Sequence, residues 1–312
     1  MEAAVDEQSY EIYTNDPHYP ASLTELSDAP PVLYVRGNLE ALKRPGLSIV
    51  GARGATPYGR AIAEMAARVA AESGIAVISG GARGCDAAAG AEAIEAGGTH
   101  IAVLGCGADV VYPKSSRRLL EQTIVSGGAL VSLDPWGTPP RRWAFPRRNR
   151  VIAALGLALL VTEAGIPSGT FSTAEAALEL GRELLAVPGS ILSNSSRGSN
   201  RLIAEGAVCI ADEEALEVAI SRIFGVLRPG RLAIQQREDM SEAERHLMTA
   251  LVASPITIEA IGRLLNLDGQ AALILVSSLL SRGLVERLVD GRISASAATL
   301  HALSSVGHHT TC

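Results

Sequence analysis

The chain of 312 residues carries 27 Lys and Arg against 33 Asp and Glu, a formal net charge of -6, and is 47% hydrophobic but only 4% aromatic. Its length predicts two domains, or one large and one small domain. Its mild acidity does not suggest a protein that coats nucleic acid. Its apolar runs fall short of the roughly 18–20 residues of a membrane span, and the acidic start, MEAAVDEQSYE, lacks a signal-peptide core, so we expect a cytoplasmic protein without membrane contact.

The first 222 residues predict one α/β domain. Residues 1–45, which include Pro17, Pro20, Pro30 and Pro31, are expected to form an irregular lead-in that packs on the core. From 46 to 222, short β-branched runs alternate with helical stretches, which predicts an extended Rossmann-like, doubly wound, mainly parallel sheet. The strand candidates are residues 47–52, 75–80, 100–105, 129–133, 157–164 and 183–189.

The remaining chain predicts a small second domain. Residues 223–240 are expected to be a linker and residues 301–312 a flexible tail. Between them, residues 241–300 contain three short helical patterns and a hairpin that turns at Asp290-Gly291, which is typical of a winged-helix-like domain. Its third helix, Gln270 to Ser281, is almost uncharged, and this favours protein contact over contact with duplex DNA.

In a doubly wound sheet, ligands bind outside the carboxyl ends of the strands. The loops expected there are rich in Gly, Ser, Thr and Arg; they are 51–56, 80–86, 105–113, the long 133–150, 163–173 and 188–200. Glycine lets backbone amides approach an anion, and helix N-termini add positive charge. The pattern therefore predicts a phosphate-binding face to which Arg53, Arg83 and Arg197 contribute.

Several ligand classes are disfavoured. GARGAT is a poor GxGxxG, and the second strand ends in Ser79-Gly80-Gly81 without the carboxylate that holds the ribose of NAD. The chain has no GxxxxGK[ST], HExxH or GxSxG motif, and Cys85, Cys106, Cys209 and Cys312 lack CxxC spacing. We therefore expect no cofactor, no metal, no catalytic residues and reduced thiols.

The stretch 141–150, RRWAFPRRNR, holds five arginines and two aromatic rings in an acidic chain. Cationic grooves along the backbone and rings that stack on bases are how proteins bind single-stranded nucleic acid, with roughly 1–3 kcal/mol per stacked base. The stretch therefore predicts a site for single-stranded DNA or RNA.

Seven segments resemble the DNA-processing protein A family (DprA, also called Smf) of bacterial natural transformation. They are NDPHYPASLTELSDAPPVLYVRG (15–37), SIVGARGATPYG (48–59), ISGGARGCDAAA (78–89), GGTHIAVLGCGADVVYP (97–113), GTPPRRWAFPRRNRVIA (137–153), EAGIPSGTFSTAEAALELGRELLAVPGS (163–190) and SRGSNRLIAEGA (196–207). The resemblance implies a non-enzymatic protein of DNA recombination that binds single-stranded DNA without strong sequence preference. It also implies protection of incoming DNA, homodimer formation and loading of the recombinase RecA.

The resemblance also implies which residues bind DNA. By motif position these are Gly51, Arg53, Arg142, Phe145, Arg147, Arg148, Asn149, Arg150, Ser168 and Gly169. Two positions depart from the family pattern: the run after Arg83-Gly84 reads Cys85-Asp86 and lacks a following His, and Pro167 stands where a basic residue is common. The second departure removes one possible phosphate contact.

Alternative interpretations remain open. The arginines could form ion pairs with Asp134 or Glu163, and Arg150 with Asn149 could brace the loop. Arg83 and Asp86 could support each other. Trp143 and Phe145 could anchor the loop in the core rather than stack on bases. A different class of function, a hydrolase of nucleoside phosphates, would use the same loops and need Glu163 or Asp109 as its carboxylate. A third possibility is a scaffold for RecA in which DNA contact is secondary.

Overall fold

The computed structural model describes residues 8–226, 241–253, 255–288 and 291–296. The chain divides into two compact units, residues 1–228 and 229–312. The predicted linker, 223–240, overlaps the end of a helix, and its residues 227–240 lie outside the described residues, as does the predicted tail, 301–312.

The predicted doubly wound, mainly parallel sheet is confirmed. The six expected strands form its parallel centre: β3 Gly46–Val50, β4 Ala76–Ser79, β5 His100–Leu104, β6 Ala129–Ser132, β7 Ala158–Val161 and β8 Glu183–Ala186. The full nine-strand order is β1-β2-β6-β5-β4-β3-β7-β8-β9. The parallel part of the sheet starts at β3, continues through β4 and β5 to β6, and returns to β7 on the other side of β3. The carboxyl ends of β3 and β7 flank the switch point, where such sheets form their binding crevice.

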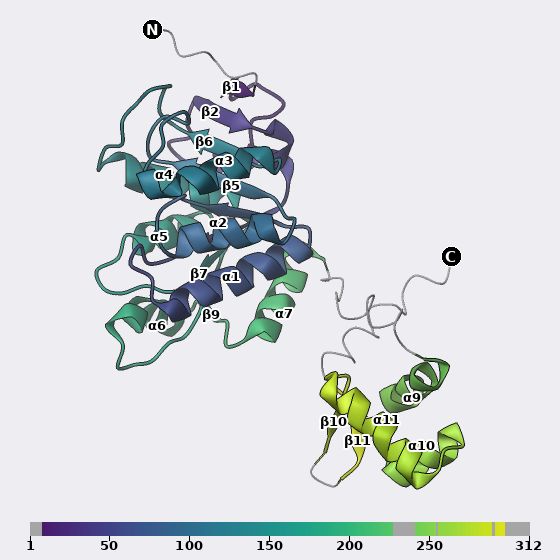
Figure 1. Cartoon of the computed structure of the whole chain (residues 1–312). Helices are drawn as coiled ribbons and strands as arrows, with labels where there is room; N and C mark the ends of the chain where they lie inside the picture. The colour runs from purple at the N-terminus through teal and green to yellow at the C-terminus, as the bar shows by residue number, and fades with distance from the viewer. Residues whose placement is uncertain (1–7, 227–240, 254, 289–290, 297–312) are drawn as a thin grey trace. The chain divides into compact units, whose positions relative to one another are not determined.

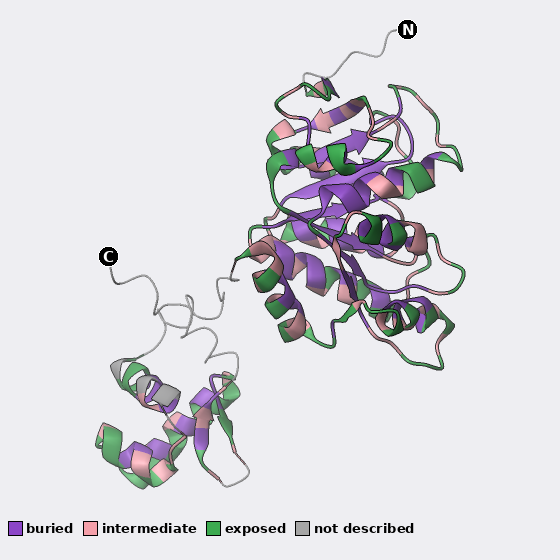
Figure 2. Cartoon of the chain, turned by 180° about the vertical axis from the view of Figure 1, so that it is seen from behind, coloured by how far each residue is buried: buried purple, intermediate pink, exposed green. Residues whose placement is uncertain are grey.

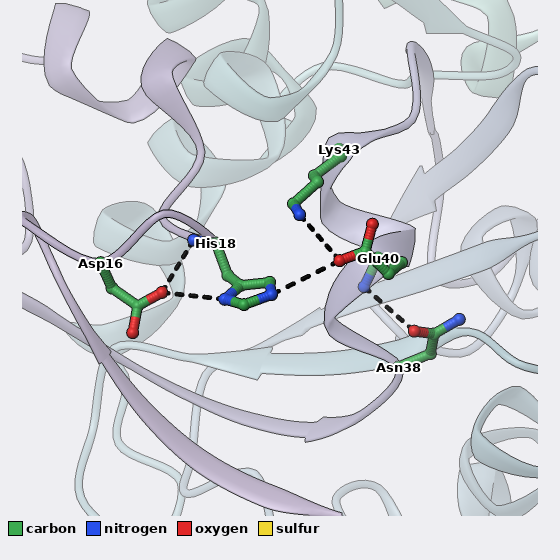
Figure 3. A network of polar contacts seen from close by, with 5 residues as sticks. All are labelled: Asp16, His18, Asn38, Glu40 and Lys43. Carbon is green, nitrogen blue, oxygen red and sulfur yellow. Dashed lines mark hydrogen bonds and ion pairs between the residues drawn. The ribbon is translucent and has the colours of Figure 1, made fainter.

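The lead-in differs from the irregular segment that the prolines suggested. Strands β1 Ser9–Tyr13 and β2 Val32–Gly37 extend the sheet antiparallel beyond β6, and β9 Val208–Cys209 closes the other edge. A polar network steadies the segment between β1 and the core (Figure 3): the His18 ring lies 3.0 Å from Asp16 and 3.4 Å from Glu40, which also pairs with Lys43 at 2.7 Å. The lead-in is thus part of the sheet.

Helices cover both faces of this sheet (Figure 1). One layer holds α1 Pro57–Glu72, α2 Cys85–Glu95, α3 Arg117–Val125 and α7 Glu213–Phe224; the other holds α4 Ala144–Leu155, α5 Thr170–Glu179 and α6 Arg197–Ala204. The strands between the layers are buried on both sides, as Figure 2 shows. Because few aromatic residues are available, Ala, Val, Ile and Leu dominate both cores.

The prediction of a long loop at 133–150 is wrong for residues 144–150. Residues 144–150 open helix α4, whose apolar end, Val151 to Leu155, is buried in the core. Pro146 does not prevent this, because it stands in the first helical turn, where its missing N–H has no partner to lose. The helix is the crossover that parallel strands β6 and β7 require.

The second unit contains α9 Glu242–Ala253, α10 Ile258–Leu265, α11 Gly269–Ser281 and the antiparallel pair β10 Val285–Arg287 and β11 Ile293–Ala295. They enclose a core of their own that includes Leu247, Ile261 and Val276. The order of elements is that of the predicted domain, and its winged-helix-like character stays a prediction; the expected turn includes Asp290, outside the described residues. By length and composition, no single described helix could cross a membrane; only α10 and α11 taken together, bent by 107°, reach that size.

Candidate nucleic-acid interface

The basic stretch lies at the carboxyl edge of the sheet, where β6 leads into α4. Arg141 and Arg142 are exposed just before the helix, and the Arg141 carbonyl accepts a hydrogen bond from the Ala144 amide. The loop after β3 (51–56), the loop after β4 (80–84) and the loop after β5 (105–113) reach the same edge because their strands are parallel. Segments far apart in the sequence therefore meet around the start of α4.

Phe145 is the residue that joins these segments. The Arg53 guanidinium lies over its ring at 5.0 Å from the centroid, and the Tyr112 ring is 5.9 Å away. The ring packs so closely on Gly105 that a Cβ there would lie 2.8 Å from Phe145 Cδ1. A cation over an aromatic face contributes about 0.5–1 kcal/mol at an exposed site. Phe145 therefore supports Arg53, and one of its faces is already covered.

Trp143 and Arg147 form a second pair of ring and cation. The Arg147 guanidinium lies 5.2 Å from the centre of the Trp143 ring, which is 57% exposed. Arg147 is also hydrogen-bonded to Asp134, whose side chain is only 8% exposed. One of the ion pairs weighed from the sequence is therefore present, although the Arg147 side chain stays 42% exposed.

Arg148 points inward, unlike its neighbour. It is 4% exposed and donates a 2.9 Å hydrogen bond to the Val103 carbonyl. A Cβ on Gly80 would lie 1.7 Å from Arg148 Nη1 and 2.5 Å from Asp86 Oδ2, which places the two side chains together under the loop after β4. Burial lowers the pKa of Arg148 to about 10, and the nearby Asp86 charge opposes this shift. Arg148 thus supports the site from the protein interior and is not free to contact a DNA strand.

Asp86 occupies three of the backbone amides that the glycine-rich loops were expected to offer to phosphate. It accepts a 3.0 Å hydrogen bond from the Gly80 amide, and the amides of Ala82 and Gly51 also stabilise its carboxylate. Burial nevertheless raises the pKa of Asp86, because desolvation outweighs the Arg148 charge and these amides. The cation whose charge acts on Asp86 is Arg148, and not Arg83, the partner considered from the sequence. These three amides are therefore not available to a phosphate.

The remaining predicted residues mostly brace the helix. Asn149 donates a 2.9 Å hydrogen bond to Ser172 Oγ, and Ser168 Oγ accepts from the Thr170 amide at the start of α5. Arg150 lies 3.1 Å from Asp28 and 3.4 Å from Glu179, and its side chain is 30% exposed. Gly169 is exposed beside Ser168. These contacts match the bracing alternative for Asn149 and Arg150.

Several side chains remain open to a ligand. Arg53, Arg83, Arg141, Arg142 and Arg197 are exposed, and none of them forms an ion pair within the described ranges. Sequence reasoning left Tyr112 and Trp143 out of the predicted set, yet they are 43% and 57% exposed beside Phe145 and Arg147. The sequence feature that could have identified Tyr112 as a site residue is its position in the loop after β5, which is one of the loops at the carboxyl edge of the sheet.

The carboxylates that a hydrolase would need hold loops in place. Glu163 is 1% exposed, and its two oxygens accept hydrogen bonds from the amide and the hydroxyl of Thr56, at 2.9 and 2.7 Å. Asp109 accepts from the Gly137 amide at 2.8 and 2.9 Å. In the part of the chain that the structure describes, no group of three His, Cys, Asp or Glu side chains could hold a metal ion.

Two cysteines, Cys85 and Cys106, lie in the interior next to these loops. Cys85 and Cys106 are buried, and burial raises the pKa of each thiol to about 11. Thiols with such pKa values stay protonated near neutrality and are poor nucleophiles. The two residues act as packed side chains under the loops, as expected.

Comparison with known proteins points in one direction. The family model of the DNA recombination-mediator protein A matches residues 11–220. Protein Smf of Escherichia coli K12 is 41% identical over 200 residues, and DNA processing protein DprA of Streptococcus pneumoniae R6 is 41% identical over 192 residues. These matches cover 64% and 62% of this chain, and 54% and 67% of the relatives. The chain thus spans about half to two thirds of the length of these relatives.

Two solved structures agree with this match. The X-ray structure of DNA processing protein A from Streptococcus pneumoniae has a TM-score of 0.63 and 37% identity, covering 67% of this chain and 74% of that one. A structure of DNA processing protein A from Helicobacter pylori, determined for its single-stranded DNA binding mode, has a TM-score of 0.63 and 27% identity, covering 69% and 97%.

Proposed function

Because the chain belongs to the DNA recombination-mediator protein A family, we propose that it binds single-stranded DNA at the carboxyl edge of its sheet. The observation that carries this proposal is the stacking of Arg53 on Phe145, which joins the loop after β3 to the basic start of α4. Exposed arginines would contact phosphates, and exposed rings would stack on bases. We infer that Arg53, Arg142, Arg147 and Trp143 contact the strand, while Arg148, Asn149 and Arg150 hold α4 in position.

The test is a comparison of single- and double-stranded oligonucleotides over a salt series. We expect the logarithm of the affinity for the single strand to fall linearly with the logarithm of salt, by about 0.7 per phosphate neutralised. Arg53→Ala should weaken binding to all sequences alike and reduce this slope. Arg222→Ala is the matched control: it removes the same charge from α7 at the opposite edge, where Arg222 pairs with Glu183, the first residue of β8. Equal affinity of parent and Arg53→Ala would refute the assignment.

Further parts of the proposal follow from the family. We infer that the protein protects single strands, loads RecA, forms a homodimer and acts in the cytoplasm during transformation or recombination. RecA captured by the chain only when DNA is present indicates loading onto the strand, whereas capture without DNA indicates the scaffold alternative. Light scattering measures the dimer directly.

The nucleoside-phosphate hydrolase is the weaker alternative, and we propose a non-catalytic protein instead. The support for this choice is that Glu163 and Asp109 use their oxygens to hold Thr56 and Gly137. Nucleotides incubated with the chain should release no free base. Base release that Glu163→Gln abolishes would overturn the proposal.

A further inference from the structure

A cavity of about 400 Å³ lies beside the interface, between the lead-in and α4. Its apolar walls come from Leu26, Pro30 and Pro31 of the lead-in, Leu133 after β6, and Val151 of α4. The Tyr19 hydroxyl donates a 2.6 Å hydrogen bond to the Pro30 carbonyl and holds that wall in place. Cavities from about 300 Å³ upward that combine apolar walls with a few polar groups are typical of sites for small ligands or single ligand groups.

The polar lining offers both donors and an acceptor. Arg147 and Arg150 lie one turn apart on the same face of α4, and Asp28 faces them from the lead-in. The Asp28 side chain is 57% exposed, so much of its acceptor capacity is open to a ligand. Arg150 Nε is buried and makes no hydrogen bond, although Asp28 Oδ1 is 3.1 Å away. The other contacts of Arg150, with Ser27 and Glu179, are long, at 3.3 and 3.4 Å.

The charges around the cavity disfavour a phosphate as the occupant. Three carboxylates, Asp28, Asp134 and Glu179, pair with the two arginines. A group that fits must instead be flat, largely apolar on its faces, and able both to donate and to accept hydrogen bonds. Guanine meets these conditions: its N2 amino group donates, and its O6 and N7 accept from arginine.

We propose that this cavity is a base subsite that selects guanine from the bound strand. Asp28 accepts hydrogen bonds from the donor edge of guanine, Arg147 and Arg150 donate to its acceptors, and Pro30 and Val151 contact its faces. The inference rests on the proposed function, because Arg147 borders the cavity and also covers Trp143 of the interface. The strand therefore passes the mouth of the cavity, and one base can turn into it.

The experiment compares oligothymidylate with the same oligomer carrying a single central dG, which avoids four-stranded guanine structures. We expect the dG oligomer to bind the parent chain at least about fivefold more tightly, the low end of discrimination by paired base contacts. Inosine, which lacks the N2 amino group, should lose part of the gain. Asp28→Ala should abolish the gain, which is measured as the ratio of the affinities for the two oligomers and is therefore independent of any change common to both.

Glu25→Ala is the matched control. Glu25 pairs with Arg182 in the same lead-in and is not part of the cavity lining, so its removal changes the net charge equally but should leave the dG gain intact. Equal binding of both oligomers to the parent, or a gain that survives Asp28→Ala, would overturn the subsite. Free dGMP that binds while dG in the strand brings no gain would overturn its assignment to the strand. Failure of the proposed function would look different, because Arg53→Ala would then leave the affinity for both oligomers unchanged.

Discussion

Replacing Arg148 by Met tests whether this arginine supports the fold or contacts DNA. The substitution removes the cation beside the buried Asp86 carboxylate and the hydrogen bond to the Val103 carbonyl, at 2.9 Å. Its neighbour Arg147 is half exposed, so adjacent residues of one basic motif are expected to have different roles. The prediction is a loss of stability for Arg148→Met and a loss of affinity with at most a small loss of stability for Arg53→Met.

The magnitude follows from burial. Arg148 stabilises the ionised Asp86 carboxylate by its nearby charge, without a direct ion pair, and removing the charge that compensates a buried carboxylate costs at most about 3–5 kcal/mol. For a domain of this size each kcal/mol lowers the midpoint of thermal unfolding by about 2–4 °C, which gives a decrease of about 6–20 °C. The loss should grow as pH rises, because a carboxyl group with a raised folded pKa is tolerated when protonated and destabilises the fold once ionised.

Thermal and denaturant unfolding at pH 5 and pH 8, with oligonucleotide binding measured well below the midpoint, separate the two roles. Arg53→Met, an exposed substitution, should change stability by no more than about 1 kcal/mol, the upper end for a cation over a ring at an exposed site. The double variant Arg148→Met with Asp86→Asn should recover part of the loss, because no unpaired buried charge remains. An Arg148→Met protein as stable as the parent but weaker in DNA binding would refute the reasoning.

Three further predictions concern other parts of the unit. Phe145→Leu should lower the affinity for single strands about fivefold by removing the surface on which Arg53 lies, whereas Phe145→Tyr should retain it, as measured by fluorescence anisotropy. Thr56→Val should cost about 2–3 kcal/mol in denaturant unfolding, since the hydroxyl both caps α1 and bonds buried Glu163, and Thr56→Ser should be close to the parent. Burial lowers the pKa of His100 to about 4, so as the pH falls the unfolded chain binds a proton at this residue before the folded chain does. The free energy of unfolding should therefore decrease by up to roughly 3 kcal/mol between pH 6.5 and pH 4. His100→Gln should flatten this dependence.

The parallel centre of the sheet could be predicted because its strands are buried on both faces and read as short, continuous apolar runs. The two lead-in strands could not, because β2 alternates buried and half-buried residues and follows Pro30-Pro31, and because β1 carries mainly polar or exposed side chains. The place of β2 depends on pairing with β6, which is distant in the sequence, and β1 in turn pairs with β2. Such pairing is set by tertiary contacts rather than by local sequence.

The arginines of RRWAFPRRNR show why composition alone could not assign roles within the site. Treated as a loop, 141–150 presents five equivalent cations, but in helix α4 consecutive side chains are turned by about 100° from each other. Phe145 and Arg148, three residues apart, therefore share the face toward the sheet, where Gly80 and Gly105 leave room for them. Arg147 and Arg150 face the lead-in, while Arg141 and Arg142, before the helix, stay in solvent. The position of each arginine around helix α4 decides whether it can contact DNA or instead holds the helix in place. The sequence did not reveal this helix, because Pro146 in its first turn suggested a loop.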